Sequence, residues 1–301
     1  MEVTPCRNSR TRLVIHAENY SDRYVIDPAN VVYDRHPLLE ACVEAMQIPD
    51  GLDIEVTLYS SVPGGSSTGT SASVAVALIG ALDLLTPGRL ALHEIAIKAH
   101  EVESRRLRLQ CGIQDQLCAA FGGISYIQMT DYPNASVSPI PIPNSLWWEL
   151  ESRLSLVYLG RSHKSSEVHQ MVIAELESAG SGGAKIDALR KPPVAGRDAL
   201  FAGDLNAFGR AMIANTDAQL NLHPALASER HRAVIEVARR QKAIGLKING
   251  AGGDGGSVTI LSGASRPEQR RMLREIESLG NGVQAIPLYL SRFGLRVWES
   301  L

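Results

Sequence analysis

The clearest pattern in the chain is an alternation of apolar and polar residues that leads into a loop of small residues. Across residues 53–59, the apolar side chains Ile54, Val56 and Leu58 occupy every second position. This period of two predicts a half-buried β-strand. After the loop, Val74–Leu85 is almost continuously apolar, which predicts a buried helix. The predicted order is therefore strand, small-residue loop, helix.

Similar patterns recur along the rest of the chain. Short apolar or alternating runs predict strands, and apolar residues spaced three and four apart predict helices. The other predicted strands are Thr11–His16, Ile124–Met129, Leu154–Leu159, Leu246–Ile248, Ser257–Leu261, Val283–Leu290 and Leu295–Trp298. The other predicted helices are His36–Met46, Leu92–Leu107, Ile113–Phe121, Ser166–Leu176, Asp204–Leu220, Ala225–Ala243 and Pro267–Leu279. This mixture predicts an α+β second half.

Prolines supply the expected breaks. Pro133, Pro139, Pro141 and Pro143 lie close together and indicate a turn or linker. A domain boundary is therefore expected near Leu150, which gives domains at residues 1–150 and 151–301. Residues 192–193 are both proline, and they predict a break in the structure that follows residue 186.

The loop at residues 63–73 reads Pro-Gly-Gly-Ser-Ser-Thr-Gly-Thr-Ser-Ala-Ser and holds three glycines and six hydroxyl residues. Glycine allows a backbone to approach a ligand closely, and the free N–H groups of the following helix attract anions. The loop therefore predicts a phosphate site, with a flexible turn as the alternative. A Walker P-loop has the same order of elements but requires a Gly-Lys-Ser/Thr ending. No lysine occurs between Tyr59 and Leu85, so this motif is excluded.

A second loop, at residues 249–256, reads Asn-Gly-Ala-Gly-Gly-Asp-Gly-Gly and contains five glycines. It lies between two predicted strands, and a hairpin needs far fewer glycines. A close approach of its backbone to a ligand or to another loop explains the excess, and a flexible hairpin is the alternative.

Composition narrows the class of protein. The 301 residues are 45% hydrophobic and 21% charged, which is typical of a globular protein with a sizeable core. A net charge of -2 favours neither a nucleic-acid nor a membrane partner. The four cysteines form no Cys-x-x-Cys pair, and the N-terminus has no signal-peptide pattern. The sequence therefore predicts a protein of the reducing cytoplasm, without a zinc site or a disulfide framework.

Three oxygen-bearing side chains are candidates for phosphate chemistry. Phosphoryl transfer needs positioning and charge neutralisation, and Mg²⁺ binds hard oxygen ligands. Ser71 in the first loop, Glu103 and Asp115 can supply such oxygens. A solvated helix face shared with Glu101 is the alternative for Glu103. A favourable interaction with the dipole of its own helix is the alternative for Asp115.

These segments together resemble the GHMP kinase superfamily. The family's phosphate loop, Pro-x-x-x-Gly-Leu-Gly-Ser-Ser, is matched at Pro63, Gly69 and Ser71, and small hydroxyl residues replace the remaining fixed positions. Residues 250–256 are similar to the family's C-terminal glycine loop.

Two further segments resemble the sugar 1-kinases that act on D-glycero-D-manno-heptose 7-phosphate, and related fucokinase-like proteins. Residues 112–123 combine Gly-Ile-Gln-Asp-Gln with a following Ala-Ala-Phe-Gly-Gly. Residues 158–166 read Tyr-Leu-Gly-Arg-Ser-His-Lys-Ser-Ser, which fits the Tyr-x-Gly-x-x-(Arg/His)-x-Ser-Ser form of that branch.

The resemblance implies an α+β fold with a ribosomal-protein-S5-like N-terminal half and a ferredoxin-like C-terminal half. It implies ATP as the phosphate donor, Mg²⁺ held by Ser71 and Glu103, and Asp115 as the group that accepts or orients the proton of the substrate hydroxyl. The ATP phosphates are expected on Pro63, Gly64, Gly65, Ser66, Ser67, Thr68, Gly69, Thr70 and Ser71. Contacts to the substrate, or support for the phosphate loop, are expected from His163, Lys164, Ser165, Ser166, Gly250, Gly252 and Gly253. A surface polar cluster is the alternative for residues 163–166.

The sequence departs from the family pattern in two places. The family's N-terminal segment Pro-x-Arg-x-x-x-x-Gly-Gly-Gly-x-Asp does not occur, and residues 1–5 resemble the middle of a family strand. The first domain is therefore expected to lack its first strand and loop. Asp254 stands where the family usually has glycine. A carboxylate beside phosphates is repulsive unless a metal or a basic residue lies close to it.

The predicted function is an ATP-dependent kinase that transfers the γ-phosphate to a hydroxyl, expected to be anomeric, of a sugar or sugar phosphate such as D-glycero-D-manno-heptose 7-phosphate. Two alternatives stay open. One is a catalytically weak relative that binds sugar or nucleotide as a sensor. The other is a kinase for a small non-sugar alcohol.

Overall fold

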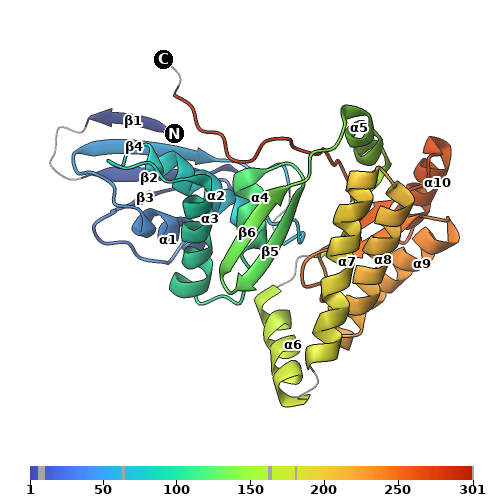
Figure 1. Ribbon diagram of the computed structural model, residues 1–301. Helices are drawn as coiled ribbons and strands as arrows, with labels where there is room; N and C mark the ends of the chain where they lie inside the picture. The colour runs from blue at the N-terminus through green and yellow to red at the C-terminus, as the bar shows by residue number, and fades with distance from the viewer. Residues whose placement is uncertain (6–10, 63–64, 162–164, 180–181, 300–301) are drawn as a thin grey trace.

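The chain folds into two halves, each with its own sheet, that lie side by side (Figure 1). The structure is a computed structural model, and it describes residues 1–5, 11–62, 65–161, 165–179 and 182–299. The predicted mixture of helices and strands is confirmed in both halves.

The first half is built on a four-stranded sheet with the order β1-β4-β2-β3. Strands β2 and β4 are parallel, and β1 and β3 pair with them in antiparallel directions. Helices cover the sheet, and an antiparallel hairpin of β5 and β6 lies beside them (Figure 1). The strands are β1 (Glu2–Pro5), β2 (Arg12–Ala17), β3 (Asp22–Ile26), β4 (Leu52–Leu58), β5 (Ser125–Asp131) and β6 (Asn134–Pro139). The helices are α1 (Pro37–Ala45), α2 (Thr70–Asp83), α3 (Leu92–Glu101) and α4 (Gln114–Phe121).

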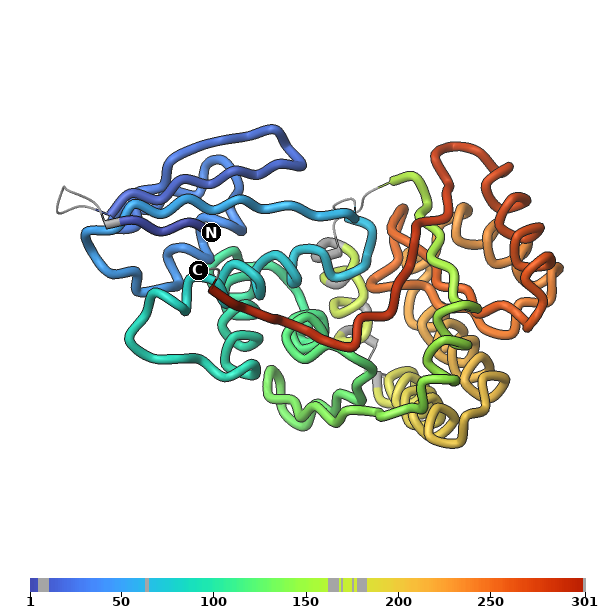
Figure 2. The backbone as a smooth tube through the Cα atoms, turned by 90° about the horizontal axis from the view of Figure 1, so that it is seen from above, coloured from blue at the N-terminus to red at the C-terminus, as the bar shows by residue number. Residues whose placement is uncertain are grey.

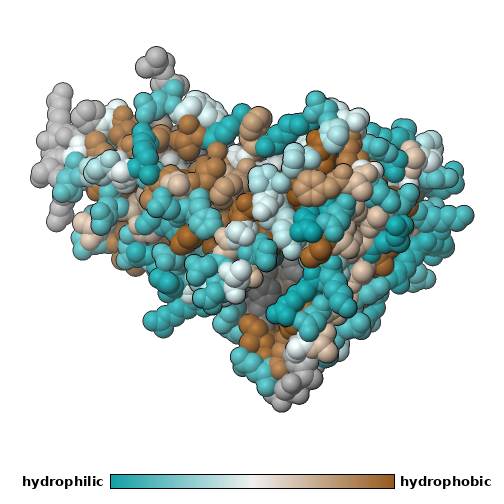
Figure 3. Space-filling model, in the orientation of Figure 1, coloured by the Kyte–Doolittle hydropathy of each residue, from teal (hydrophilic) through white to brown (hydrophobic). Residues whose placement is uncertain are grey.

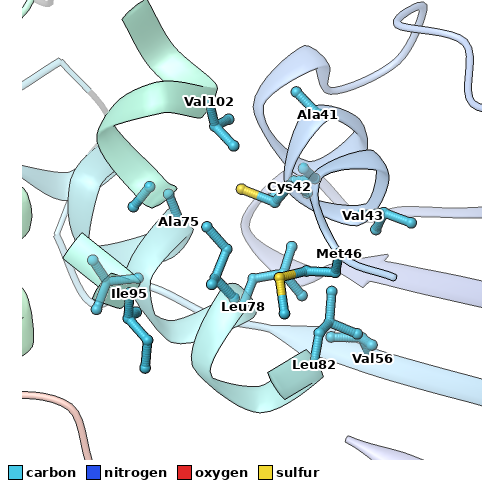
Figure 4. Close-up of a cluster of buried hydrophobic side chains, with 14 of the residues drawn as sticks. Ala41, Cys42, Val43, Met46, Val56, Ala75, Leu78, Leu82, Ile95 and Val102 are labelled. Carbon is cyan, nitrogen blue, oxygen red and sulfur yellow. The ribbon is translucent and has the colours of Figure 1, made fainter. Parts of the chain in front are cut away.

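The core of this half explains why α2 is so apolar. Its Ala75, Leu78 and Leu82 side chains pack against Cys42 of α1 and Val56 of β4, and all are buried (Figure 4). A helix buried on most of its circumference has an apolar sequence with little amphipathic pattern. The thiol of Cys42 lies inside this core, and burial raises its pKa, so it packs there as a small apolar group.

The second half contains an antiparallel sheet with the order β10-β7-β9-β8. Two crossovers, each carrying helices, connect its strands: α6 to α9 lie between β7 and β8, and α10 lies between β9 and β10. Helix α5 precedes this sheet, and the expected domain boundary at residue 150 falls inside α5. The strands are β7 (Leu154–Leu159), β8 (Gly245–Ile248), β9 (Ser257–Leu261) and β10 (Val283–Ile286). The helices are α5 (Asn144–Arg153), α6 (Ser165–Ala179), α7 (Gly182–Ala202), α8 (Leu205–Leu220), α9 (Glu229–Arg240) and α10 (Arg266–Glu277).

Three expectations drawn from breaker residues and short patterns are wrong. Helix α7 continues through Pro192 and Pro193, because its packing along α8 outweighs the two lost N–H donors. The proline-rich stretch after residue 132 is mostly regular, since it forms β6 and then α5. Pro139 is the last residue of β6 and Pro143 lies just before α5, where a missing N–H costs little. Residues 295–298 are extended but form no strand.

Residues 287–299, here called the C-terminal strap, run from the second half back across the first (Figure 2). Gly123 N–H donates to the Ser291 carbonyl at 2.9 Å, and Leu295 N–H donates to the Ala120 carbonyl at 3.0 Å. A Cβ atom at Gly122 would overlap the backbone of Gly294. The Gly-Gly pair that ends α4, as the sequence predicted, therefore also gives the strap room to dock.

The outer surface of the second half is mainly hydrophilic on the face shown in Figure 3, with smaller hydrophobic patches. Within the described residues, none of the helices combines the length and apolar character needed to cross a lipid bilayer.

We expect Gly122→Ala to destabilise the protein by roughly 2 kcal/mol or more, because the new methyl group meets the strap backbone at a φ of +66°. Urea unfolding measures this change. Gly88→Ala is the matched control, because a Cβ atom there meets nothing within 4 Å. Equal stability of the two variants would show that the strap does not need this glycine.

Candidate active site

A cavity of about 1340 Å³ lies where the first small-residue loop meets the start of α2 and the second glycine loop. Its wall includes residues 65–72, Glu103, Asp115, Gly250 and Ala251. Segments that are far apart in the sequence therefore meet around one hollow.

The start of α2 is open toward this cavity. Its N-cap residue, Gly69, has a left-handed φ of +71° and provides no side chain to cap the helix. The first helical bond returns from Ser73 N–H to the Gly69 carbonyl at 2.9 Å. The preceding N–H groups, of Thr70, Ser71 and Ala72, therefore have no partner within the helix. Open N–H groups at the positive end of a helix dipole form a natural site for phosphate.

Hydroxyl groups of the loop are linked to one another beside this helix end. The hydroxyls of Ser66 and Thr68 lie 2.8 Å apart, and those of Thr68 and Thr70 lie 3.2 Å apart. Ser66 is only 1% exposed. Thr68 and Thr70, which stand where the family pattern has leucine and its first serine, thus order the loop.

Glu103 is a buried carboxylate on the cavity wall. It lies in a π-type turn, Val102–Arg106, that continues α3, and such turns often occur at functional sites. Ser71 and Gln116 hydrogen-bond to its carboxylate. Burial raises the pKa of Glu103, these two hydrogen bonds oppose the shift, and the charge of Asp115 adds to it. The carboxylate of Glu103 is therefore held by neutral hydrogen-bond donors. A cation bound beside it would lower the free energy of its ionised form.

Asp115 lies in the first turn of α4, next to the loop. A Cβ atom at Gly69 would come within 3.3 Å of the Asp115 side chain, so the glycine allows this close approach. The charge of Asp115 also acts on Glu103. Ser71, Glu103 and Asp115 thus share one cavity wall.

The second glycine loop docks directly on the first loop. Ser257 Oγ, at the start of β9, donates to the Ser66 carbonyl at 2.6 Å, and Asn249 Nδ2 donates to Ser257 Oγ at 2.9 Å. A Cβ atom at Gly250 would lie 3.3 Å from Cβ of Ser67. The excess of glycine therefore serves a close approach of two loops.

The unusual carboxylate of Asp254 has a basic partner. Arg161 Nη1 donates to Asp254 Oδ2 at 2.5 Å, and the Arg161 carbonyl accepts from Gly256 N–H at 3.0 Å. The expected repulsion is therefore reduced by a cation from the segment that follows β7.

The other predicted site residues are distributed as follows. Gly252 and Gly253 lie in the second loop, and Gly252 packs against the Leu226 carbonyl. Ser165 and Ser166 are the first residues of α6, and their side chains lie outside the described structure. The following predicted residues lie outside the described residues: Pro63, Gly64, His163 and Lys164.

Another part of the cavity wall was not predicted from the sequence. It is lined by rings and apolar side chains, among them Tyr20, His36, Leu38, Tyr59 and Val62. Tyr20 and His36 contact each other, with ring centroids 5.0 Å apart. These residues come from three separate segments without a shared motif, so only the fold brings them together.

Comparison with known proteins finds similarity to one group of kinases. Residues 33–123 match the family model of the GHMP kinases N-terminal domain. The chain is 26% identical over 204 residues to D-glycero-alpha-D-manno-heptose 7-phosphate kinase of Campylobacter jejuni, covering 68% of this chain and 60% of that protein. It is 28% identical over 271 residues to mevalonate kinase of Pyrococcus abyssi, covering 89% of this chain and 74% of that protein.

Solved structures show the same fold over nearly the whole chain. The structure of a D-glycero-D-manno-heptose 1-phosphate kinase from Bacteroides thetaiotaomicron has a TM-score of 0.72 at 20% identity and covers 99% of this chain and 86% of that one. Galactokinase of Lactococcus lactis has a TM-score of 0.74 at 14% identity and covers 97% and 84%. Residues 33–123 are thus similar to the N-terminal domain of the GHMP kinases, and the chain spans about 60% of the length of the heptose kinase that it matches. The predicted resemblance to this family is confirmed over these residues.

We expect Glu103→Gln to stabilise the protein relative to the wild type as pH rises. A carboxyl group with a raised pKa in the folded state contributes stability at low pH, and this contribution is lost as pH rises through the folded pKa. Urea unfolding between pH 4 and 8 measures the difference. Glu101→Gln is the control, because Glu101 is more exposed and pairs with Arg105. A difference independent of pH would contradict the assigned environment of Glu103.

Proposed function

We propose that this protein is an ATP-dependent kinase that transfers the γ-phosphate to a hydroxyl group of a sugar or sugar phosphate. The observation that carries this proposal is the meeting of Ser71, Glu103 and Asp115 at the open start of α2. An anion site, a buried carboxylate and a second carboxylate within one cavity are the parts that phosphoryl transfer requires.

The first loop and the N–H groups of α2 would bind the phosphates of ATP. The described residues contain no cluster of three or more His, Cys, Asp or Glu side chains that could hold a metal without help. Mg²⁺ typically takes one or two carboxylates and completes its shell with water and phosphate oxygens. Ser71 and Glu103 fit this requirement, because a hydroxyl and a buried carboxylate contact each other there. When bound, Mg²⁺ would neutralise charge on the phosphates.

Asp115 would orient the substrate hydroxyl and accept its proton. A carboxylate that lines the cavity can accept a hydrogen bond from an alcohol. Its approach to Gly69 would keep the hydroxyl beside the phosphate loop. Positioning of this kind supplies a large share of the rate in phosphoryl transfer.

A sugar phosphate such as D-glycero-D-manno-heptose 7-phosphate is the proposed substrate, and transfer to its anomeric hydroxyl is the proposed reaction. The similarity to the Campylobacter enzyme and the residue 112–123 segment support this choice. A hydroxy acid is the second candidate, because the match to a mevalonate kinase covers more of this chain. The pairing of Asp254 with Arg161 weakens one argument for an inactive sensor.

We further propose that residues 1–150 form an S5-like domain and residues 151–301 a ferredoxin-like domain. The second half supports this, because its β-α-β-β-α-β connectivity and its strand order β10-β7-β9-β8 correspond to that motif.

The test is a coupled assay of ADP formation with ATP, Mg²⁺ and a panel of sugars, sugar phosphates and hydroxy acids. We expect turnover with at least one sugar phosphate. Asp115→Asn should lower kcat by on the order of 10²-fold or more, because the proton acceptor is lost. Asp131→Asn is the control, since Asp131 is exposed at the end of β5. Turnover by Asp115→Asn at the wild-type rate, or none by the wild type with any acceptor, would reject the proposal.

A further inference from the structure

Lys247 is a partly buried lysine that no step above uses. It lies on β8, where its register partner on β9 is Thr259. Its Nζ donates to Gln219 Oε1 at 2.6 Å and to the Ile248 carbonyl. Both acceptors are neutral. A buried ammonium group without a carboxylate partner is costly, so its retention calls for a physical reason.

Gln219 passes the influence of Lys247 to the second glycine loop. The ammonium group can only donate, so the amide oxygen of Gln219 must face it. The amide nitrogen then faces the other way and donates to the Gly250 carbonyl at 2.9 Å. The orientation of Gln219 is therefore set by Lys247.

Helix α8 holds Gln219 in place for this contact. Thr216, one turn earlier, is 2% exposed and donates to the Leu246 carbonyl at 2.9 Å. Residues three positions apart lie on the same face of a helix. Gln219 is thus fixed on the face that packs against β8.

The Gly250 carbonyl determines where the next N–H group points. In a trans peptide, the C=O and the following N–H point in opposite directions. Because the carbonyl of Gly250 faces Gln219, the N–H of Ala251 faces away from it. Gly250 and Ala251 both line the cavity, and Gly250 approaches Ser67 of the first loop.

We propose that Lys247 and Gln219 are positioning residues that direct the Ala251 N–H toward the terminal phosphates of the bound nucleotide. This inference rests on the proposed kinase function. Strand β9 holds Asn249, the residue before Gly250, because Thr259 Oγ1 donates to Asn249 Oδ1 at 3.0 Å. The side chains of Gln219 and Thr259, from α8 and β9, therefore hold the first two residues of the second glycine loop in place.

Protonation of Lys247 separates this role from a merely structural one. Burial lowers the pKa of Lys247 from 10.5 to about 8. The elements that pack against β8 also carry charged groups. Asp217 of α8 pairs with Arg239 of α9, and Thr259 of β9 is neutral. Between pH 8 and 10.5 the unfolded chain binds more protons than the folded one, so Lys247 makes stability rise with pH. Turnover should fall over the same range as the donor loses its charge.

The experiment compares the wild type with Lys247→Met, Gln219→Glu and the control Lys191→Met, which alters an exposed lysine of α7. We expect Lys247→Met to keep or raise the Tm, because a buried charge is removed. We expect its kcat to fall roughly tenfold and the decline of wild-type kcat near pH 8 to disappear. Gln219→Glu keeps the acceptor for Lys247 but loses the donor to Gly250, so its kcat should fall similarly. Lys191→Met should match the wild type.

A parallel loss of Tm and kcat in Lys247→Met with an unchanged pH profile would overturn the proposal, since it indicates structural support alone. If the wild type phosphorylates no acceptor, the kinase function fails, and calorimetry with Mg²⁺ and a non-hydrolysable ATP analogue still tests the pair. Lys247→Met should then bind the analogue roughly tenfold more weakly at pH 7. Equal affinity in the wild type and Lys247→Met would reject the role of Lys247.

Discussion

The hydrogen bond from Ser257 to the Ser66 carbonyl is the contact on which the site depends. Both residues are almost fully buried, and a carbonyl left unpaired in such a place costs about 1–3 kcal/mol. Ser257 is held in turn by Asn249, and Asn249 by Thr259. The shape of the small-residue loop in the first half is therefore set by a chain of polar contacts that starts in the sheet of the second half.

Burial also determines the electrostatics of the site. Glu103 lies among neutral donors in the first half, and Lys247 lies among neutral acceptors in the second. Neither carries a buried partner of opposite charge among the contacts that the structure describes. Each charge is costly to hold inside the protein. Under the proposed kinase function, Mg²⁺ would offset the charge of Glu103, and Lys247 would act on the nucleotide through Gln219 and the second glycine loop.

Local signals in the sequence were sufficient for most elements, and they singled out Ser71, Glu103 and Asp115, which line one cavity in the structure. The alternation in β4 and the spacing of helices α1 and α10 depend on neighbours along the chain, and both were predicted. Helix α7 and strand β6 were missed, because distant packing decides them. The links from Ser257 to Ser66 and from Gln219 to Gly250 join residues 191 and 31 positions apart. No local pattern encodes such pairs.

The C-terminal strap has a mechanical consequence. It fastens the second half to α4 and α2 through backbone contacts at Ala120 and close packing at Gly80, while the paired loops fasten the halves at Ser66. Two bodies joined at separate points have fewer relative motions open to them than two bodies joined at a single hinge.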